Sequence, residues 1–91
     1  MNEYDIKTYD NVPSWVKNLK IGEYIMVYFP RKKRIVYSEV LSNVIPQSSD
    51  YFAILTIKYK INNLEMLDEL LYDNYLGESE ADTSWKAYQI M

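Results

Sequence analysis

The sequence of 91 residues contains neither cysteine nor histidine. Without cysteine, the chain can form no disulfide, no thiolate zinc site and no cysteine nucleophile. Without histidine, it lacks the commonest general base and the commonest metal ligand of proteins. These absences predict that the protein is not an enzyme, and a chain without disulfides suits the reducing cytoplasm.

Glycine is almost as scarce, because the chain has only Gly22 and Gly77. Two isolated glycines cannot build a glycine-rich phosphate-binding loop. The acids of residues 78–82 are spaced like those of a divalent-cation loop, but they lack the central glycine and the distal glutamate of a calcium-binding loop. We therefore predict no metal, no cofactor and no catalytic residue.

Long apolar runs are missing as well. No run reaches the ~18–20 residues that a membrane-spanning helix needs, and residues 1–10 lack the pattern of a signal peptide. The sequence predicts a cytoplasmic protein that does not enter a membrane.

The chain does contain several apolar segments of strand length, and its size predicts a single domain over residues 1–91. Three runs rich in β-branched and aromatic residues, at 23–29, 35–44 and 51–61, are separated by a basic tetrapeptide and by a Pro/Ser/Asp cluster. Such runs, bounded by turn-forming residues, predict an antiparallel meander. A last short strand is predicted over 85–91, and residues 1–11 form either an edge strand or a loosely docked arm.

Two helices are predicted around this meander. Pro13 suits the first turn of a short helix over residues 13–20. A longer helix is predicted after Asn62, which resembles an N-cap with Glu65 at capping-box spacing, and Gly77 marks its end. An apolar stripe follows the helical period at Leu64, Leu67, Leu71 and Tyr75.

The predicted fold class is therefore α+β. We expect a small antiparallel sheet, made of a three-stranded meander plus a C-terminal strand, with one short N-terminal helix and one amphipathic helix packed on one face. An open sheet is favoured over a small barrel, because the leucine stripe needs an apolar sheet face to cover.

Charge is distributed unevenly along the chain, whose net charge is −3. Residues 1–63 carry nine lysines and arginines against six acids, whereas residues 64–91 carry one lysine against seven acids. Such an asymmetry points to the kind of partner that a surface attracts.

The acidic third is the first candidate site. At helical spacing, four of its acids would share the face opposite the leucines, and three more follow in the loop; the set is Glu65, Asp68, Glu69, Asp73, Glu78, Glu80 and Asp82. The plain interpretation is a solubility face. The sharper one is a surface that imitates the phosphate rows of a nucleic acid and occupies a basic groove of another protein, with electrostatic steering of the encounter.

The basic tetrapeptide is the second candidate site. Its cations stand at a predicted hairpin tip with tyrosines nearby, and the set is Arg31, Lys32, Lys33, Arg34, Tyr28 and Tyr37. Cations mixed with aromatic rings are typical of surfaces that hold phosphates and stack bases. The plain interpretation is a solvated turn that keeps an edge soluble. The acidic net charge argues against nucleic acid, because four cations alone bind it weakly at physiological salt.

Three functional classes follow. The favoured one is a small non-enzymatic inhibitor that binds a host protein with a basic groove, such as a defence nuclease or a polymerase, in the cytoplasm of a bacterial host. In small size and lack of catalytic residues the chain resembles, in general character only, the counter-defence and host-takeover proteins of bacteriophages. The alternatives are a nucleic-acid-binding module that uses the basic hairpin and the tyrosine-rich sheet, or an accessory, oligomerising subunit. The sequence leaves the oligomeric state open.

Overall fold

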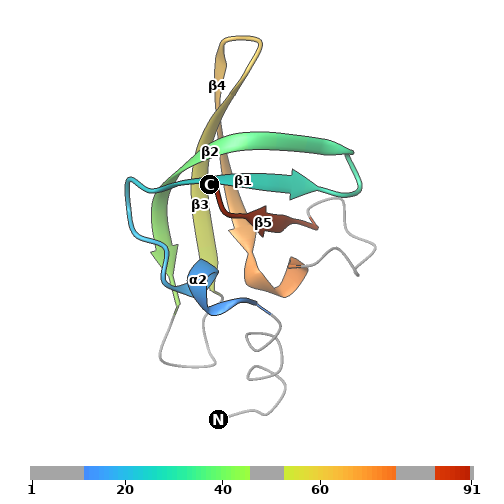
Figure 1. Cartoon of the computed structure of the whole chain (residues 1–91). Coiled ribbons are helices and arrows are strands. Elements are labelled where there is room, and N and C mark those ends of the chain that lie inside the picture. The colour runs from blue at the N-terminus through green and yellow to red at the C-terminus, as the bar shows by residue number, and fades with distance from the viewer. Residues whose placement is uncertain (1–11, 46–52, 76–83, 91) are drawn as a thin grey trace.

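The computed structural model describes residues 12–45, 53–75 and 84–90. They form one five-stranded antiparallel sheet in the order β4-β3-β2-β1-β5 (Figure 1). The elements are α2 (Ser14–Lys17), β1 (Tyr24–Phe29), β2 (Arg34–Val44), β3 (Ile54–Ile61), β4 (Leu64–Leu71), the 3-10 turn η1 (Tyr72–Asn74) and β5 (Lys86–Tyr88). The predicted arm at 1–11 and the predicted turn at 46–50 lie outside the described residues.

The three strands of the meander form as predicted, and along β1 and β3 buried residues on one face of the sheet alternate with more exposed residues on the other. In β1, Ile25, Val27 and Phe29 are buried and the residues between them are not. In β3, Leu55 and Ile57 are fully buried in the same way. The short helix and the last strand also lie within their predicted ranges, as α2 and β5.

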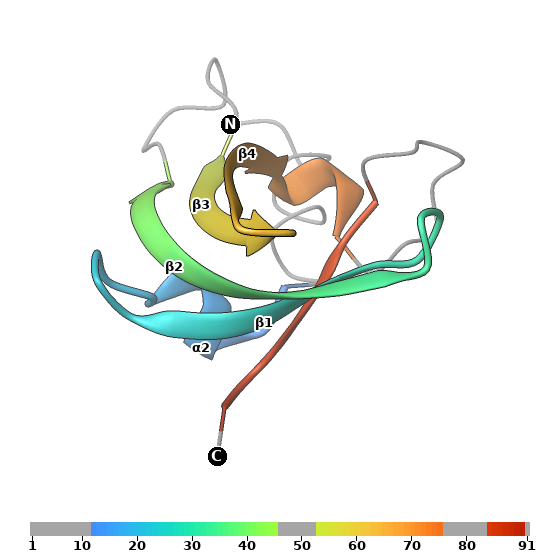
Figure 2. The same ribbon diagram turned by 90° about the horizontal axis from the view of Figure 1, so that it is seen from above.

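The sheet is strongly curled but does not close (Figure 2). The long strand β2 pairs with β1 through residues 34–39 and with β3 through residues 39–44, and its register shifts between Val40 and Ser42. A shift of this kind bends a strand and increases its twist. An isolated parallel bridge from Tyr75 to Trp85 then joins the chain after β4 to the residue before β5. The sheet is thus open, as predicted over a closed barrel, because β4 and β5 remain its two edges. The expectation that an amphipathic helix covers its apolar face is wrong, since the curl of the sheet encloses that face.

Trp85 is the largest fully buried side chain among the described residues. The rings of Tyr72 and Tyr75 meet it edge-on, with centroids 5.8 Å and 4.7 Å away. Its indole Nε1 donates a hydrogen bond of 2.7 Å to the carbonyl of Leu71. Because the indole N–H has a hydrogen-bond partner, the burial of Trp85 leaves no donor of its side chain unsatisfied. This cluster therefore holds η1 and β5 together.

The amphipathic helix predicted after Asn62 is wrong, since residues 64–71 form strand β4. Asn62 and Asn63 both have positive φ angles, of 51° and 68°, and join β3 to β4 by a tight turn. Asparagine tolerates this left-handed region, and two such residues in succession suit a hairpin whose strands twist together. Asn62 is therefore a turn residue and not a helix cap.

The leucine stripe does not form a buried helical face. Leu64 and Leu67 are 68% and 63% exposed, whereas Leu70 is only 3% exposed. Leucine, glutamate and methionine favour helix intrinsically, but this preference is weak against pairing with β3 along all eight residues of β4. The α+β prediction holds only coarsely, as one antiparallel sheet with few helical residues. No helix in the described ranges has the length and apolar character needed to cross a membrane.

Asn43 of β2 fastens α2 to the sheet. Its side-chain Nδ2 lies 3.1 Å from each of three carbonyl oxygens at the end of α2, those of Val16, Lys17 and Leu19. Its Oδ1 accepts a hydrogen bond of 2.6 Å from the hydroxyl of Tyr72. One amide thus reaches three carbonyls at the end of the helix, where backbone donors are scarce, although the carbonyl of Val16 also accepts from the amide of Leu19 over 3.2 Å.

We expect Asn43→Ala to lower the free energy of unfolding by about 2–3 kcal/mol, because it leaves buried carbonyls and a buried hydroxyl without this partner. Urea denaturation followed by circular dichroism measures the loss. Asn18→Ala, at an exposed asparagine at the end of the same helix, is the control and should cost far less. Equal losses in the two variants would contradict the role given to Asn43.

Candidate functional site

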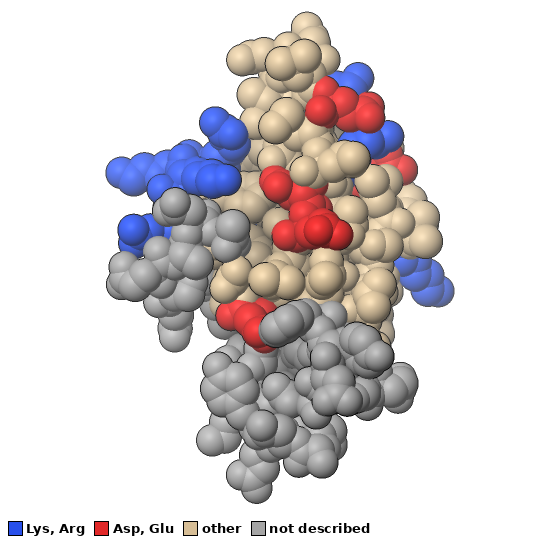
Figure 3. All heavy atoms as spheres, turned by 180° about the vertical axis from the view of Figure 1, so that it is seen from behind, with Lys and Arg blue, Asp and Glu red and all other residues tan. Residues whose placement is uncertain are grey.

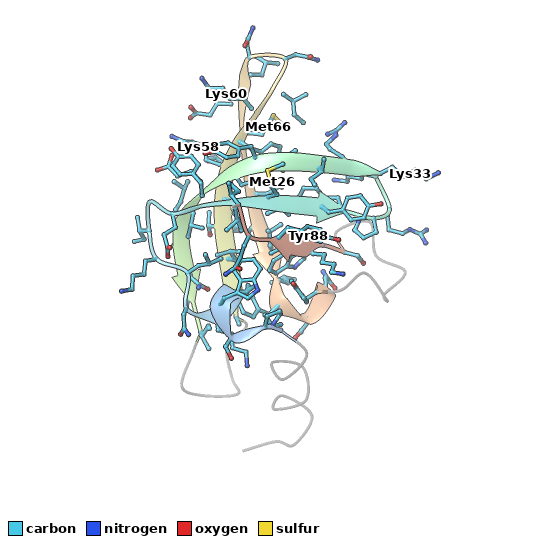
Figure 4. The ribbon with its side chains drawn as sticks, in the orientation of Figure 1. Met26, Lys33, Lys58, Lys60, Met66 and Tyr88 are labelled. Atoms are coloured by element: carbon cyan, nitrogen blue, oxygen red, sulfur yellow. The ribbon has the colours of Figure 1, made fainter. Side chains whose placement is uncertain are left out.

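The face of the sheet that points away from the core is rich in tyrosine on β1, β2 and β5. Directly paired residues of antiparallel strands project to the same face. Met26 of β1 pairs with Tyr37 on one side and with Tyr88 on the other (Figure 4). We call this surface the tyrosine face, and its members are Tyr24, Met26, Tyr28, Ile35, Tyr37 and Tyr88.

The tyrosine face is exposed and partly prearranged. Tyr37, Ile35, Tyr24 and Tyr88 are 57%, 54%, 49% and 42% exposed. The rings of Tyr24 and Tyr37 are stacked, with centroids 5.1 Å apart and planes inclined by 19°. Rings already held in a fixed position lose little conformational entropy when another surface covers them. A contiguous exposed patch of this kind is typical of a docking site.

A hollow of about 430 Å³ adjoins this stacked pair, between the tyrosines and the β3–β4 hairpin. Its walls come from β1, β2, β3 and β4, namely Tyr24, Tyr37, Glu39, Lys58, Tyr59, Lys60 and Glu65. A second hollow of about 570 Å³ lies between α2 and the end of the chain, and Tyr24 lines it as well. Tyr24 therefore stands at the junction of the two hollows.

Both signs of charge line the first hollow. The Nζ of Lys58 lies 3.6 Å from Oε1 of Glu39, and the hydroxyl of Tyr24 donates to the same oxygen over 3.4 Å. Lys60 stands opposite Glu65 in the register of β3 and β4. The hollow therefore offers aromatic surface together with balanced donors and acceptors, which differs from the uniformly basic lining of a phosphate-binding site.

Tyr59 closes the side of the hollow toward the core. Its hydroxyl donates a hydrogen bond of 2.5 Å to Oδ2 of Asp68, and the two residues come from neighbouring strands. Burial, followed by the hydrogen bond and the charge of Asp68, raises the pKa of Tyr59 to about 12. Burial likewise raises the pKa of Tyr72 to about 12. Both phenols are therefore neutral donors at physiological pH.

The predicted acidic face does not form, because residues 64–71 are a strand. Glu65 and Glu69 project to the outer side, opposite Lys60 and Thr56, while Asp68 projects to the other side and meets Tyr59. Asp73 lies in η1 and is exposed. Glu78, Glu80 and Asp82 lie outside the described residues. The structure separates the four acids that helical spacing would have gathered, and their role in binding stays a prediction.

The predicted basic site is brought together only in part. Arg31 to Lys33 lie in the exposed β1–β2 turn, and Arg34 begins β2. Figure 3 shows a group of lysine and arginine side chains on one flank, apart from the carboxylates near the middle of that view. Lys32 Nζ lies 5.6 Å from the ring centroid of Phe29, a core residue. Tyr28 and Tyr37 project to the tyrosine face instead. Lys32 therefore contacts the ring of a core residue and not the tyrosines of that face.

Eight residues of the surface and its hollow were missed as site candidates: Tyr24, Met26, Ile35, Glu39, Lys58, Tyr59, Lys60 and Tyr88. Period-2 alternation in the sequence sets Tyr24 on the face opposite Ile25 and Val27, and it sets Lys58 on the face opposite Leu55 and Ile57. Aligning the faces of neighbouring predicted strands would have brought both to one surface. Tyr88 gave no such signal, because its neighbour Met26 lies far away in the sequence.

Nothing in the structure identifies a metal site: within the described ranges, no group of three or more acidic, histidine or cysteine side chains could hold an ion. Compared with known protein families, with curated proteins and with solved structures, the chain shows no significant match. Evidence on function therefore comes from the tyrosine face and the adjoining hollow alone.

The raised pKa of Tyr59 predicts a stability loss at alkaline pH. A phenol whose pKa is higher in the folded than in the unfolded state contributes stability that is fully present below the unfolded value of 10.0 and is lost as the pH rises toward about 12. We expect Tyr59→Phe to be less stable than the wild type at neutral pH, with the difference narrowing across this range. Urea denaturation at a series of pH values measures it.

Tyr88→Phe, which removes a hydroxyl from an exposed ring, is the matched control for the alkaline series. A difference between wild type and Tyr59→Phe that stays constant up to pH 12 would contradict the assignment.

Proposed function

We propose that this protein is a non-enzymatic binding module that docks on another protein through the tyrosine face and the adjoining hollow. One observation carries the proposal: the outer face of β5, β1 and β2 exposes four large side chains, by 42–57%, that are contiguous in the register of the strands. Isolated exposed apolar residues are ordinary, but a contiguous patch marks an interaction site.

The chemistry of the surface favours a protein as the partner. Tyrosine combines a large apolar ring with a polar end and is enriched at protein interfaces. The hollow beside the stacked pair presents lysines and glutamates together, so that a mixed polypeptide surface finds both donors and acceptors there. Such a patch provides an aromatic centre with a polar rim, which is the usual anatomy of an interface.

Direct binding of nucleic acid is supported less well. Glu39 lies against the hydroxyl of Tyr24, and Glu65 lines the same hollow, so a phosphate backbone would meet carboxylates beside the only stacked tyrosines of the described face. Nucleic-acid surfaces combine stacking rings with net positive charge. The experiment below therefore also measures binding to oligonucleotides.

The proposal keeps one part of the sequence-based hypothesis, namely that the protein inhibits a host protein by binding to it. A small module that covers a surface of a host protein in the bacterial cytoplasm can block that protein without any chemistry of its own. The acidic mimic of a nucleic acid is not part of this proposal, because the acids of β4 point to different sides of the strand.

The test begins with capture of partners from a nuclease-treated bacterial lysate, followed by affinity measurement with the purified partner. We expect Tyr37→Ala and Tyr24→Ala each to weaken the affinity by about 10–100-fold, the range of a central aromatic contact in an interface. Ile21→Ala is the matched control, since Ile21 is an exposed apolar residue (75%) outside the tyrosine face.

Two results would overturn the proposal. One is equal affinity for wild type and both tyrosine variants, with circular dichroism showing that the variants are folded. The other is binding to short single-stranded oligonucleotides at low salt that is lost when Arg31, Lys32, Lys33 and Arg34 are replaced by alanine. That second result would assign the function to the basic turn.

A further inference from the structure

Strand β4 forms one edge of the sheet, and within the described ranges no strand pairs with its outer side. With β3 it makes a hairpin that projects beyond the rest of the sheet (Figure 1). An edge of eight residues presents a row of backbone groups that a further strand can pair with.

The ladder shows which backbone groups face this edge. The amide of Tyr72, just after β4, donates a hydrogen bond of 3.1 Å to the carbonyl of Ala53, just before β3. In an antiparallel ladder, residues that bond to the neighbour alternate with residues that do not. Even-numbered residues of β4 therefore bond to β3. Glu65, Leu67 and Glu69 direct their N–H and C=O groups to the open edge.

Apolar side chains accompany these backbone groups. Leu67 is 63% exposed, and Leu64 and Met66 at the hairpin end are 68% and 40% exposed. Leucine and methionine at such a position are costly in water and gain when a neighbouring strand covers them. The edge therefore offers both hydrogen bonds and apolar contact.

The charges of β4 determine what can pair there. From residue 64 to residue 75 the chain carries four acids and no base. A second copy pairing symmetrically about Leu67 would place Glu65 opposite Glu69, and one pairing about Asp68 would place that carboxylate opposite itself. Like charges directly opposite one another destabilise a strand pair, whereas opposite charges stabilise it. Pairing of β4 with the β4 strand of a second copy is therefore unfavourable, whereas pairing with a strand that carries lysine or arginine is favourable.

We propose that the open edge of β4 takes up an extended, lysine- or arginine-containing segment of a partner protein as an additional antiparallel strand. Cations of that segment stand opposite Glu65 and Glu69, and an apolar residue between them stands opposite Leu67. The edge lies across the sheet from β5. Glu65 also lines the hollow beside the tyrosine face, whereas Leu67 does not, so variants at Leu67 test the edge by itself.

The probe is a short capped peptide with lysine at its first and fifth positions, valine at the third and threonine between them, so that the lysines can stand opposite Glu65 and Glu69 and the valine opposite Leu67. The comparison peptide has glutamate in place of both lysines. Binding is followed by NMR, together with amide hydrogen exchange. We expect the lysine peptide to bind and to slow exchange at the amides of Glu65, Leu67 and Glu69. The amides of Met66 and Asp68, already bonded to β3, should change far less. The glutamate peptide should not bind.

Two variants separate strand addition from simple charge attraction. Leu67→Pro removes an N–H that points to the open edge and leaves the bonds to β3 in place, as proline at an edge position allows. It should abolish peptide binding, whereas the matched control Leu67→Ala keeps the N–H and should still bind. The double substitution Glu65→Lys/Glu69→Lys should reverse the preference, so that the glutamate peptide binds at least about fivefold tighter than the lysine peptide.

Three results would overturn the inference. The lysine peptide fails to protect the odd-numbered amides; a folded Leu67→Pro binds as well as Leu67→Ala; or the same amides become protected when the protein alone is concentrated, which would make a second copy the occupant. If Leu67→Pro does not fold, the inference is still tested by the amide-exchange pattern of the wild type and by the peptide preference of the Glu65→Lys/Glu69→Lys variant. Tyr88→Ala, on the tyrosine face but at the opposite edge of the sheet and outside the hollow that Glu65 lines, should leave peptide binding unchanged, which separates this test from that of the tyrosine face.

Discussion

Strand β2 is the constraint on which the rest of the structure depends. It is long enough to pair with β1 through one half and with β3 through the other, and its register shift after Val40 bends the sheet between them. Glu39 belongs to both ladders, since it stands opposite Tyr24 on one side and Lys58 on the other. The bend turns one apolar face inward around Trp85 and leaves the tyrosines outside. The hollow beside Tyr24 lies where the two ladders meet.

Much of this arrangement could be predicted from the sequence, because alternation is a local signal. Ile25 and Val27 alternate with tyrosine and methionine, so strand, core face and outer face follow together. Residues 64–71 could not be predicted in this way. Their leucines fit a helical period and their composition favours helix, while the decisive signal was the Asn62–Asn63 turn, which binds this segment to β3. Tertiary pairing overrode propensity there.

The candidate surfaces also differ in how well the sequence predicts them, because some depend on local alternation and others on the pairing of distant strands. Tyr28 and Tyr37 were placed beside the basic turn, but the side on which each cation lies depends on register, and Lys32 turns toward Phe29. The neighbourhood of Met26 and Tyr88 joins residues far apart in the sequence, which no local pattern reveals. The grouping of Glu65, Asp68, Glu69 and Asp73 on one face was predicted least well. Its members were gathered by a helical period that the chain does not adopt, so its grouping disappeared with the helix.

A domain of this size cannot bury both faces and both edges of its sheet, since small domains leave much of their surface in water. The question is therefore how the exposed parts are kept from self-association. On the edge of β4, the carboxylates of Glu65 and Glu69 serve this purpose by repelling a second copy. The same repulsion gives the edge a preference, because whatever excludes an acidic strand attracts a basic one. Protection against aggregation and selectivity for a partner are thus one electrostatic property of β4, and reversing the two glutamates should change both at once.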